Sequence, residues 1–152
     1  RSRSIAKKIS QVRPLVTVSD LVEAVRSCTP PNYRHRPLAR VFQALRITVN
    51  EELEKLETFL KHFIDILAVG GKVVIISFHS LEDRIVKRLF KEFEKNGLGE
   101  MLFENEVKKP IIPSEEEISE NPRSRSAKLR ILKRVSEKKS KNKYEKFSKI
   151  QN

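Results

Sequence analysis

The sequence predicts an α/β fold, and three patterns support that prediction. The β-branched run Val73–Ile76 follows the Gly70-Gly71 pair and is typical of a strand covered on both faces, as in parallel sheets. A helical repeat follows at once over residues 81–95, and a longer one precedes the strand over residues 38–67. A buried strand between amphipathic helices is a building block of α/β domains.

The polar turn after this strand holds the first candidate site. Ser80 is the expected N-cap of the next helix, with Asp83 as its capping-box partner, and Gly97 marks the expected helix end. Ligands of open α/β sheets bind beyond the carboxyl ends of the strands. Ser77, His79 and Ser80 are therefore candidate catalytic or pocket-lining residues. In the structural alternative, Ser80 only caps the helix and His79 only orders the turn.

The residues before the long repeat are expected to be helical too. Residues 1–13 have the spacing of the end of a basic helix, so further residues are expected to precede them in the intact protein. Thr17 and Ser19 are N-cap candidates for a short helix over residues 20–27. Residues 32–37 are expected to form a basic connector.

The repeat over residues 38–67 has one apolar stripe at steps of three and four. A break near Asn50 or Thr58 would divide it into two helices. The polar residues Arg40, Gln43, Arg46 and Asn50 share a different face of the same repeat.

Two further strands are expected after the second helix. Residues 101–109 have a loose strand pattern, residues 110–122 form an acidic, proline-punctuated loop, and residues 127–135 alternate between apolar and basic side chains. Residues 136–152 are polar and rich in lysine, which is typical of a disordered tail.

The net charge of +12 is unevenly distributed along the chain. Residues 1–46 carry +8, residues 47–122 carry −6 and residues 123–152 carry +10. Basic ends around an acidic middle favour a polyanionic partner, and nucleic acid is favoured over a membrane because no amphipathic anchor accompanies the charge. A basic tail that only aids solubility is the alternative for residues 136–152.

Several classes of protein and site are disfavoured. No apolar run approaches the roughly 20 residues that a membrane helix needs, and Cys28 is the single cysteine, so a disulfide framework and a cysteine-rich zinc site are excluded. The composition suits the reducing cytoplasm. Cys28, His35 and His62 do not assemble into a metal site, and no metal site is predicted.

Three long segments together resemble one family, the bacterial 16S ribosomal RNA cytosine-N4 methyltransferases (methyltransferase H). The similarity covers about residues 1–135 and leaves the tail outside. The segments, in this order, are Arg40-Val-Phe-Gln-Ala-Leu-Arg-Ile-Thr-Val-Asn-Glu-Glu-Leu53, the block Gly70–Arg88 with Ser-Phe-His-Ser-Leu-Glu-Asp-Arg, and Asn121-Pro-Arg-Ser-Arg-Ser-Ala-Lys-Leu-Arg130.

The resemblance implies the C-terminal part of a class I (Rossmann-like) methyltransferase mixed sheet. Residues 1–37 would be the end of a helical insertion domain for substrate recognition, residues 38–135 the C-terminal half of the methyltransferase domain, and residues 136–152 the tail. Residues 72–78, 101–109 and 127–135 would be the last strands of the sheet, with the final pair antiparallel.

The resemblance also implies S-adenosylmethionine as cofactor and a decoding-site cytosine of 16S ribosomal RNA, in the small ribosomal subunit, as target. Candidate RNA-binding residues are Arg36, Arg40, Gln43, Arg46, Asn50, Arg123 and Arg125, with Arg130 as a further phosphate contact or, alternatively, a buried arginine that braces the sheet. The face formed by Arg40, Gln43, Arg46 and Asn50 could instead line a pocket or hold buried partners of acidic groups in the missing half.

Two departures from the family pattern affect these expectations. The family usually has His-Pro-Ala-Thr-Arg before the Phe-Gln-Ala-Leu-Arg motif, whereas here Arg36 stands in the place of that histidine and His35 is shifted by one. The family's N-terminal glycine-rich cofactor loop has no counterpart here, because Gly97 and Gly99 follow a helix. The cofactor site is therefore expected in an N-terminal half outside this chain.

The sequence thus predicts part of an S-adenosylmethionine-dependent methyltransferase that is inactive in isolation. A non-catalytic basic RNA-binding module derived from the same family is the main alternative. A ribosome-associated structural protein without a methyltransferase partner is the third.

Overall fold

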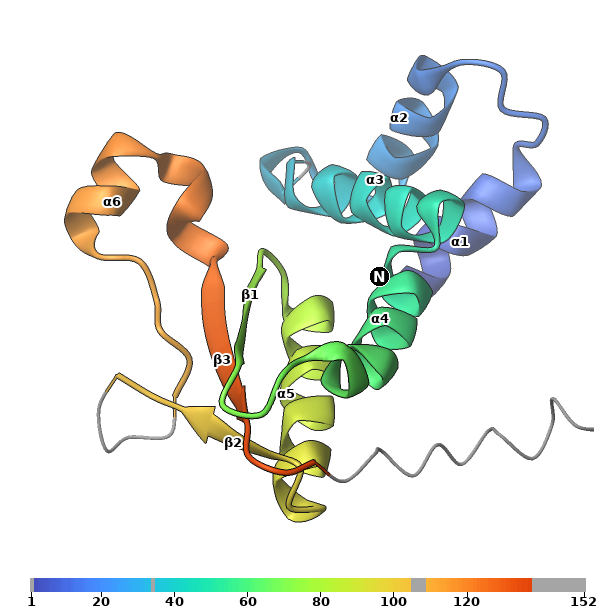
Figure 1. The fold of residues 1–152 in the computed structure, drawn as a ribbon. Helices are drawn as coiled ribbons and strands as arrows, with labels where there is room; N and C mark the ends of the chain where they lie inside the picture. Colours follow the sequence, from blue (N-terminus) through green and yellow to red (C-terminus); the bar gives the residue numbers. More distant parts are fainter. Residues whose placement is uncertain (1, 34, 105–108, 138–152) are drawn as a thin grey trace, which may run out of the picture. The chain divides into compact units, whose positions relative to one another are not determined.

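The computed structural model describes residues 2–33, 35–104 and 109–137. The chain forms two compact units, residues 1–52 and 53–152, and each is described by itself (Figure 1). The predicted domain boundary between residues 37 and 38 falls inside a helix of the first unit, so that division stays a prediction. Within the described part of the chain, no helix combines the length and apolarity needed to cross a bilayer.

The first unit is helical. Its core joins Ile5, Leu21 and Val25, all buried. Thr17 caps the second helix as predicted, because the Asp20 backbone N–H donates to Thr17 Oγ1 at 3.2 Å and the Asp20 carboxylate accepts the Thr17 N–H at 2.8 Å. The elements are α1 (Ser2–Gln11), α2 (Val18–Ser27), the 3-10 turn η1 (Pro31–Tyr33) and α3 (His35–Asn50).

The expectation that residues 32–37 form a connector is wrong from His35 onward, because α3 begins there. Pro37 does not prevent this, because a proline in the first helical turn removes an N–H that would have no partner within the helix.

The long helical repeat divides at Glu51, next to Asn50, one of the two expected positions. Glu51 has a φ of 54°, in the left-handed region, and the next helix, α4 (Glu52–Ile66), begins immediately after it. The apolar stripe predicted over residues 38–67 is therefore divided between two helices with different surroundings. Its α4 residues Leu60 and Ile64 are buried in the second unit, whereas Leu45 and Val49 on α3 are exposed.

The second unit packs helices on a three-stranded sheet (Figure 1). The strand order is β1-β3-β2, and both pairs are antiparallel. After α4 the elements are β1 (Lys72–Ser77), α5 (Ser80–Lys95), β2 (Gly99–Leu102), α6 (Glu115–Glu120), the 3-10 turn η2 (Pro122–Ser126) and β3 (Lys128–Arg134).

The core of this unit lies between α4, α5 and the sheet. The Phe63 ring of α4 meets the Phe93 ring of α5 edge-to-face at 5.6 Å and the Phe90 ring at 6.1 Å. Leu132, fully buried in the central strand, closes the core from the sheet side.

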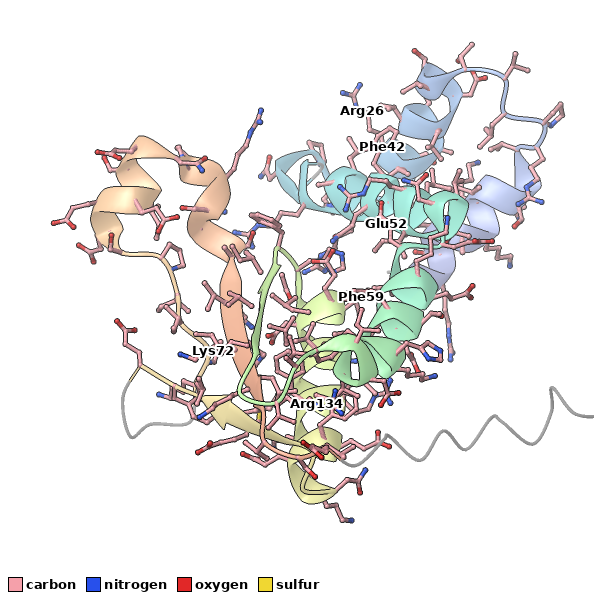
Figure 2. The ribbon with its side chains drawn as sticks, viewed as in Figure 1. Arg26, Phe42, Glu52, Phe59, Lys72 and Arg134 are labelled. Carbon is pink, nitrogen blue, oxygen red and sulfur yellow. The ribbon has the colours of Figure 1, made fainter. Side chains whose placement is uncertain are left out.

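Arg134, at the end of β3, joins the sheet to the end of α4 (Figure 2). Its guanidinium donates to the backbone carbonyls of Asp65 at 3.3 Å and Leu67 at 2.5 Å. These carbonyls stand at the end of α4, where backbone acceptors lack helical partners, so a buried cation there satisfies them and complements the helix dipole.

Two strand expectations need correction. The strand expected over residues 101–109 is β2, which runs over Gly99–Leu102, and residues 105–108 lie outside the described residues. The β-branched run is not covered on both faces in the described part of the chain, because Val74 and Ile76 are 53% and 54% exposed while Val73 and Ile75 pack on the core. Continuous apolar sequence cannot distinguish a strand covered by its own chain from one whose second face is open.

Candidate functional site

The turn from β1 into α5 is held by a capping box, displaced by one residue from the one expected. His79, not Ser80, is the N-cap, and its Nδ1 accepts the Glu82 backbone N–H at 3.3 Å. The Glu82 carboxylate accepts the N–H groups of Phe78 at 2.9 Å and His79 at 3.2 Å. Ser80 belongs to the first turn of the helix and Asp83 is free for another partner. Cap preferences pointed to the serine, but an unprotonated imidazole nitrogen accepts the same bond.

The cap determines the tautomer of His79. Because Nδ1 is an acceptor, the proton of the neutral ring is on Nε2. Nε2 lies 3.3 Å from Glu82 Oε1 but, within the described residues, this buried atom makes no hydrogen bond of good geometry. A buried N–H donor without a partner is costly and calls for an explanation.

A pocket of about 330 Å³, here called the tip pocket, lies at the carboxyl end of β1. It brings together the predicted residues His79, Ser80 and Arg125. Ser77 does not line it, since Ser77 is 2% exposed in the sheet, in register with Lys128. The full lining is His79, Ser80, Ile112, Pro113, Ile118, Arg125, Ser126, Ala127 and Lys128.

A buried ion-pair cluster lies beside the tip pocket. Asp83 Oδ1 accepts from Arg130 Nε at 2.7 Å, and Asp83 Oδ2 accepts from Arg130 at 3.3 Å and from Lys128 Nζ at 3.3 Å. The Arg130 side chain is 7% exposed. Arg130 is therefore the buried brace of the sheet, and its expected role as an exposed phosphate contact is wrong.

The same cluster controls the ionisation of Asp83. Burial alone would raise the pKa of the Asp83 carboxyl, but the hydrogen bonds and positive charges of Arg130 and Lys128 outweigh it. The pKa therefore lies below its ordinary value. The expected role of Asp83 as the capping-box partner of Ser80 is wrong, because its carboxylate binds Arg130 and Lys128 instead. Alternation along β3 could have indicated it, because Lys128 and Arg130 share one face of the strand.

The two remaining loop arginines are exposed. Arg123 and Arg125 lie on η2, which Asn121 caps by accepting the Arg123 N–H at 3.3 Å. Ser124, between them, is buried and donates to the Asn121 carbonyl at 2.8 Å. The buried serine anchors the turn, so the two guanidinium groups point outward, and only Arg125 contributes to the tip pocket.

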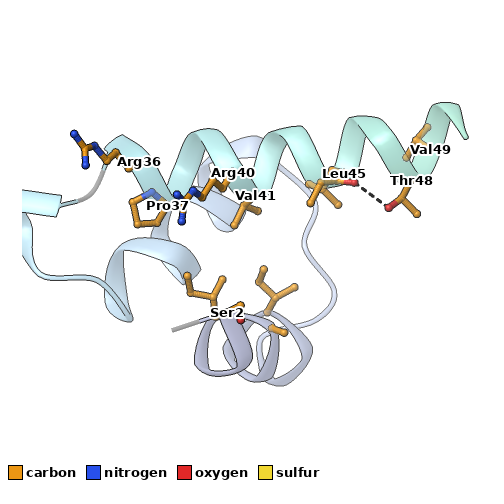
Figure 3. Close-up of a pocket in the computed structure, with 12 residues that line it drawn as sticks. Ser2, Arg36, Pro37, Arg40, Val41, Leu45, Thr48 and Val49 are labelled. Atoms are coloured by element: carbon orange, nitrogen blue, oxygen red, sulfur yellow. Dashed lines mark hydrogen bonds between the residues drawn. The ribbon is translucent and has the colours of Figure 1, made fainter. Parts of the chain in front are cut away.

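In the first unit, the predicted RNA-facing residues of α3 separate into two groups. Arg36 and Arg40 are exposed and line a groove of about 620 Å³ between α1 and α3, which continues over Val41, Leu45 and Val49 (Figure 3). The groove is basic near the beginning of α3 and apolar beyond it.

The other members of this face lie outside the groove. Arg46 Nε is 2.9 Å from Glu52 Oε1, and Asn50 Nδ2 donates to the same oxygen at 3.1 Å. Gln43 is half-buried. The Glu52 carboxylate thus holds Arg46 and Asn50 at the end of α3.

The glycines do not form a cofactor cradle. Gly70 and Gly97 have φ values of +83° and +67° and make turns, while a Cβ at Gly99 would meet the Leu132 side chain at 3.0 Å. These glycines serve turns and packing, and none lines the tip pocket. These glycines therefore do not fit the glycine-rich cofactor loop that the resemblance implies.

Comparison with known proteins gives a family match. The model of the MraW methylase family matches residues 1–135. The ribosomal RNA small subunit methyltransferase H of Nostoc punctiforme is 53% identical over 138 residues, covering 88% of this chain and 44% of the relative. The corresponding proteins of Rippkaea orientalis and Kosmotoga olearia are 54% and 49% identical, and the chain covers 43% and 45% of their lengths. The chain thus spans less than half the length of these relatives.

The buried cluster predicts a large stability loss for Asp83→Asn. The substitution leaves Arg130 buried without a counter-charge, and we expect a loss of about 3–5 kcal/mol in the free energy of unfolding at pH 7, measured with urea. Glu57→Gln is the matched control, because Glu57 pairs with Lys61 and Arg88 at a more exposed position and should cost below about 1 kcal/mol.

The pH dependence of unfolding in the wild type and in Asp83→Asn tests the same cluster. Asp83 has a lowered folded-state pKa, so its contribution is complete above the unfolded value of about 3.9 and is lost as the pH falls through the folded value. The difference between wild type and Asp83→Asn should be constant from pH 5 to 8 and shrink below about pH 4. Equal losses for the two variants at pH 7 would refute the cluster's role.

Proposed function

The chain belongs to the MraW methylase family, and we propose that it is the C-terminal part of an S-adenosylmethionine-dependent enzyme. That enzyme would methylate the N4 amine of a decoding-site cytosine in 16S ribosomal RNA, in the cytoplasm. The observation that carries the proposal is the tip pocket. There the segment containing His79 and Ser80 meets the segment containing Arg125 and Lys128, although more than 40 residues separate them.

The proposed chemistry depends mainly on orientation. The cytosine N4 lone pair is delocalised into the ring, so N4 is a poor nucleophile and must be held in line with the methyl group. The base must first be unstacked and gripped by its pairing edge. A rigid strand tip followed by a capped helix is suited to that task, because its backbone is fixed on both sides of the turn.

The tip pocket would hold the RNA through charge and hydrogen bonds. Arg125 projects from an anchored turn and can reach a phosphate, while Lys128 adds a second positive charge although it already pairs with Asp83. The Ser80 hydroxyl can donate or accept a hydrogen bond.

His79 would complete the grip on the base. Its Nε2–H lacks a hydrogen-bond partner within the described residues, and the N3 and O2 atoms of cytosine are acceptors on the pairing edge. We assign the missing partner of Nε2 to the target base, which would reach this buried atom once the side chains around it move aside. An acceptor for the N4–H group would come from another residue.

The methyl donor would be bound by residues outside this chain. In the described sheet β1 is an edge strand that pairs with β3 on one side, and its free edge suits a strand onto which the rest of a Rossmann-like sheet adds. The face at Val74 and Ile76 is open, which suits further helices that would cover that sheet. In this proposal the helices of residues 1–37 are the end of an inserted recognition domain.

A non-catalytic RNA-binding module is the second candidate. The glycines favour it, because they are occupied by turns and packing. The two candidates predict different results for a chimera of this chain with the remaining part of a relative, because only the enzyme proposal predicts methyl transfer.

The enzyme proposal predicts activity by complementation. A chimera in which residues 1–135 replace the matching residues of the Nostoc punctiforme relative should transfer a labelled methyl group to N4 of a cytosine in small-subunit RNA. The chain alone should show neither transfer nor a calorimetric signal for S-adenosylmethionine. An inactive but folded chimera would favour the binding module, and a micromolar cofactor site in the chain alone would contradict the division proposed here.

The His79 proposal predicts separate effects on stability and turnover. In the chimera, His79→Asn keeps an acceptor for the α5 cap but places no donor at Nε2, so stability should change by less than about 1 kcal/mol. Turnover should fall about 10- to 100-fold. Unchanged turnover with normal RNA affinity would remove His79 from the substrate site and leave it as a helix cap.

The two η2 arginines provide a matched comparison. Arg125→Ala should weaken RNA binding by the chimera about tenfold, because one phosphate contact at the tip pocket is lost. Arg123→Ala removes the same charge from the same turn, outside that pocket, and should have a smaller effect. Equal effects in a filter-binding titration would mean that only general charge attracts the RNA.

A further inference from the structure

The second unit carries another hollow, here called the α5 groove, with a volume of about 450 Å³. It lies along α5 and β2, further along the helix than the tip pocket. Its lining combines cations with apolar side chains: Lys87, Lys91, Glu94, Lys95, Met101, Phe103 and Arg130.

The three lysines form a row of available positive charge. Lys87, Lys91 and Lys95 are exposed and recur every four residues, so they follow one side of α5 at intervals of about 6 Å. Within the described residues, none of the three forms a side-chain ion pair or hydrogen bond. The one carboxylate in the lining, Glu94, accepts the Met101 backbone N–H at 3.5 Å.

This row is not a consequence of local composition. Residues 47–122 carry a net charge of −6, yet three lysines of that segment line the groove with one carboxylate, while the fourth cation, Arg130, comes from outside the segment and pairs with Asp83. The Glu57 carboxylate on α4 pairs with Lys61 and Arg88 and does not line the groove. A concentration of unpaired cations within an acidic segment indicates an anionic ligand.

The floor of the groove indicates which anion. Phe103 and Met101 are half-buried and give it an apolar surface. Aromatic side chains beside a positively charged track are the features with which proteins bind single-stranded nucleic acid, because bases stack on the ring while cations follow the backbone.

The groove is also connected to the tip pocket. Lys128 lines the tip pocket and Arg130 lines the α5 groove, and both bind the same Asp83 carboxylate. Along α5, Ser80 and Lys91 are separated by about 16 Å, a distance that a few nucleotides span.

We propose that the α5 groove binds the single-stranded RNA that flanks the methylated nucleotide, with Lys87, Lys91 and Lys95 on the phosphates and Phe103 under a base. This inference rests on the proposed function and adds a second RNA contact to it. Charge complementarity and the aromatic floor favour RNA over an acidic peptide, which would use the lysines but not the ring.

The test uses this chain and a fluorescently labelled oligouridylate of about 12 nucleotides, long enough for one binding track. The triple variant Lys87→Gln, Lys91→Gln, Lys95→Gln should bind at least about tenfold more weakly, and the slope of log affinity against log salt should fall by about 2. Phe103→Ala should weaken binding about tenfold with an unchanged salt slope, because it removes stacking and no charge.

A second triple variant is the control. Lys7→Gln, Lys72→Gln, Arg84→Gln removes the same charge from exposed positions outside the groove and should change the slope much less. Equal effects of the two triple variants, or RNA affinity unchanged by Phe103→Ala, would overturn the proposal for the α5 groove. Methyl transfer by the chimera would then still support the proposed function. Displacement of the RNA by polyglutamate at equal charge would indicate a peptide ligand and would also overturn it.

Discussion

The buried contact between Asp83 and Arg130 is the interaction on which the second unit and both of its candidate RNA surfaces depend. Asp83 is in the first turn of α5, Arg130 is in the central strand, and 47 residues separate them. Neither charge could remain buried without the other, since an unpaired ion in the interior is strongly destabilising. The pair therefore fixes the beginning of α5 against β3, and with it the turn that carries His79 and Ser80.

The position of this ion pair explains why two distant sequence segments form one pocket. Lys128 and Arg130 point to the same side of β3 because they are two residues apart in a strand. Asp83 binds both, so the η2 turn that precedes β3 is brought beside the cap of α5. The capping box of α5 and the salt bridge between Asp83 and Arg130 together position the η2 turn and its exposed Arg125.

Prediction from sequence succeeded where local chemistry decides the structure. The helix over residues 81–95 and the cap of α2, at Thr17 of the two candidates Thr17 and Ser19, follow from apolar period and capping chemistry. The break at Glu51 lies next to Asn50, one of the two positions expected. Prediction failed by one residue at the α5 cap, where His79 replaced Ser80. Sequence preferences rank serine above histidine, whereas the structure selects the side chain whose acceptor reaches the Glu82 N–H.

The sequence alone determined the order of the longer helices and the strands, although not the short helix α6 (Glu115–Glu120) within the expected loop. It also determined the basic character of both ends and the three segments that resemble the methyltransferase H family. These depend on periodicity, charge and residue identity, which are local. Only the tertiary structure decided that Arg130 is buried on Asp83 and Arg125 is exposed, and that lysines from an acidic segment line one groove with Phe103. Burial and pairing depend on contacts between different elements, 47 residues apart for Asp83 and Arg130, and no pattern within a single element specifies them.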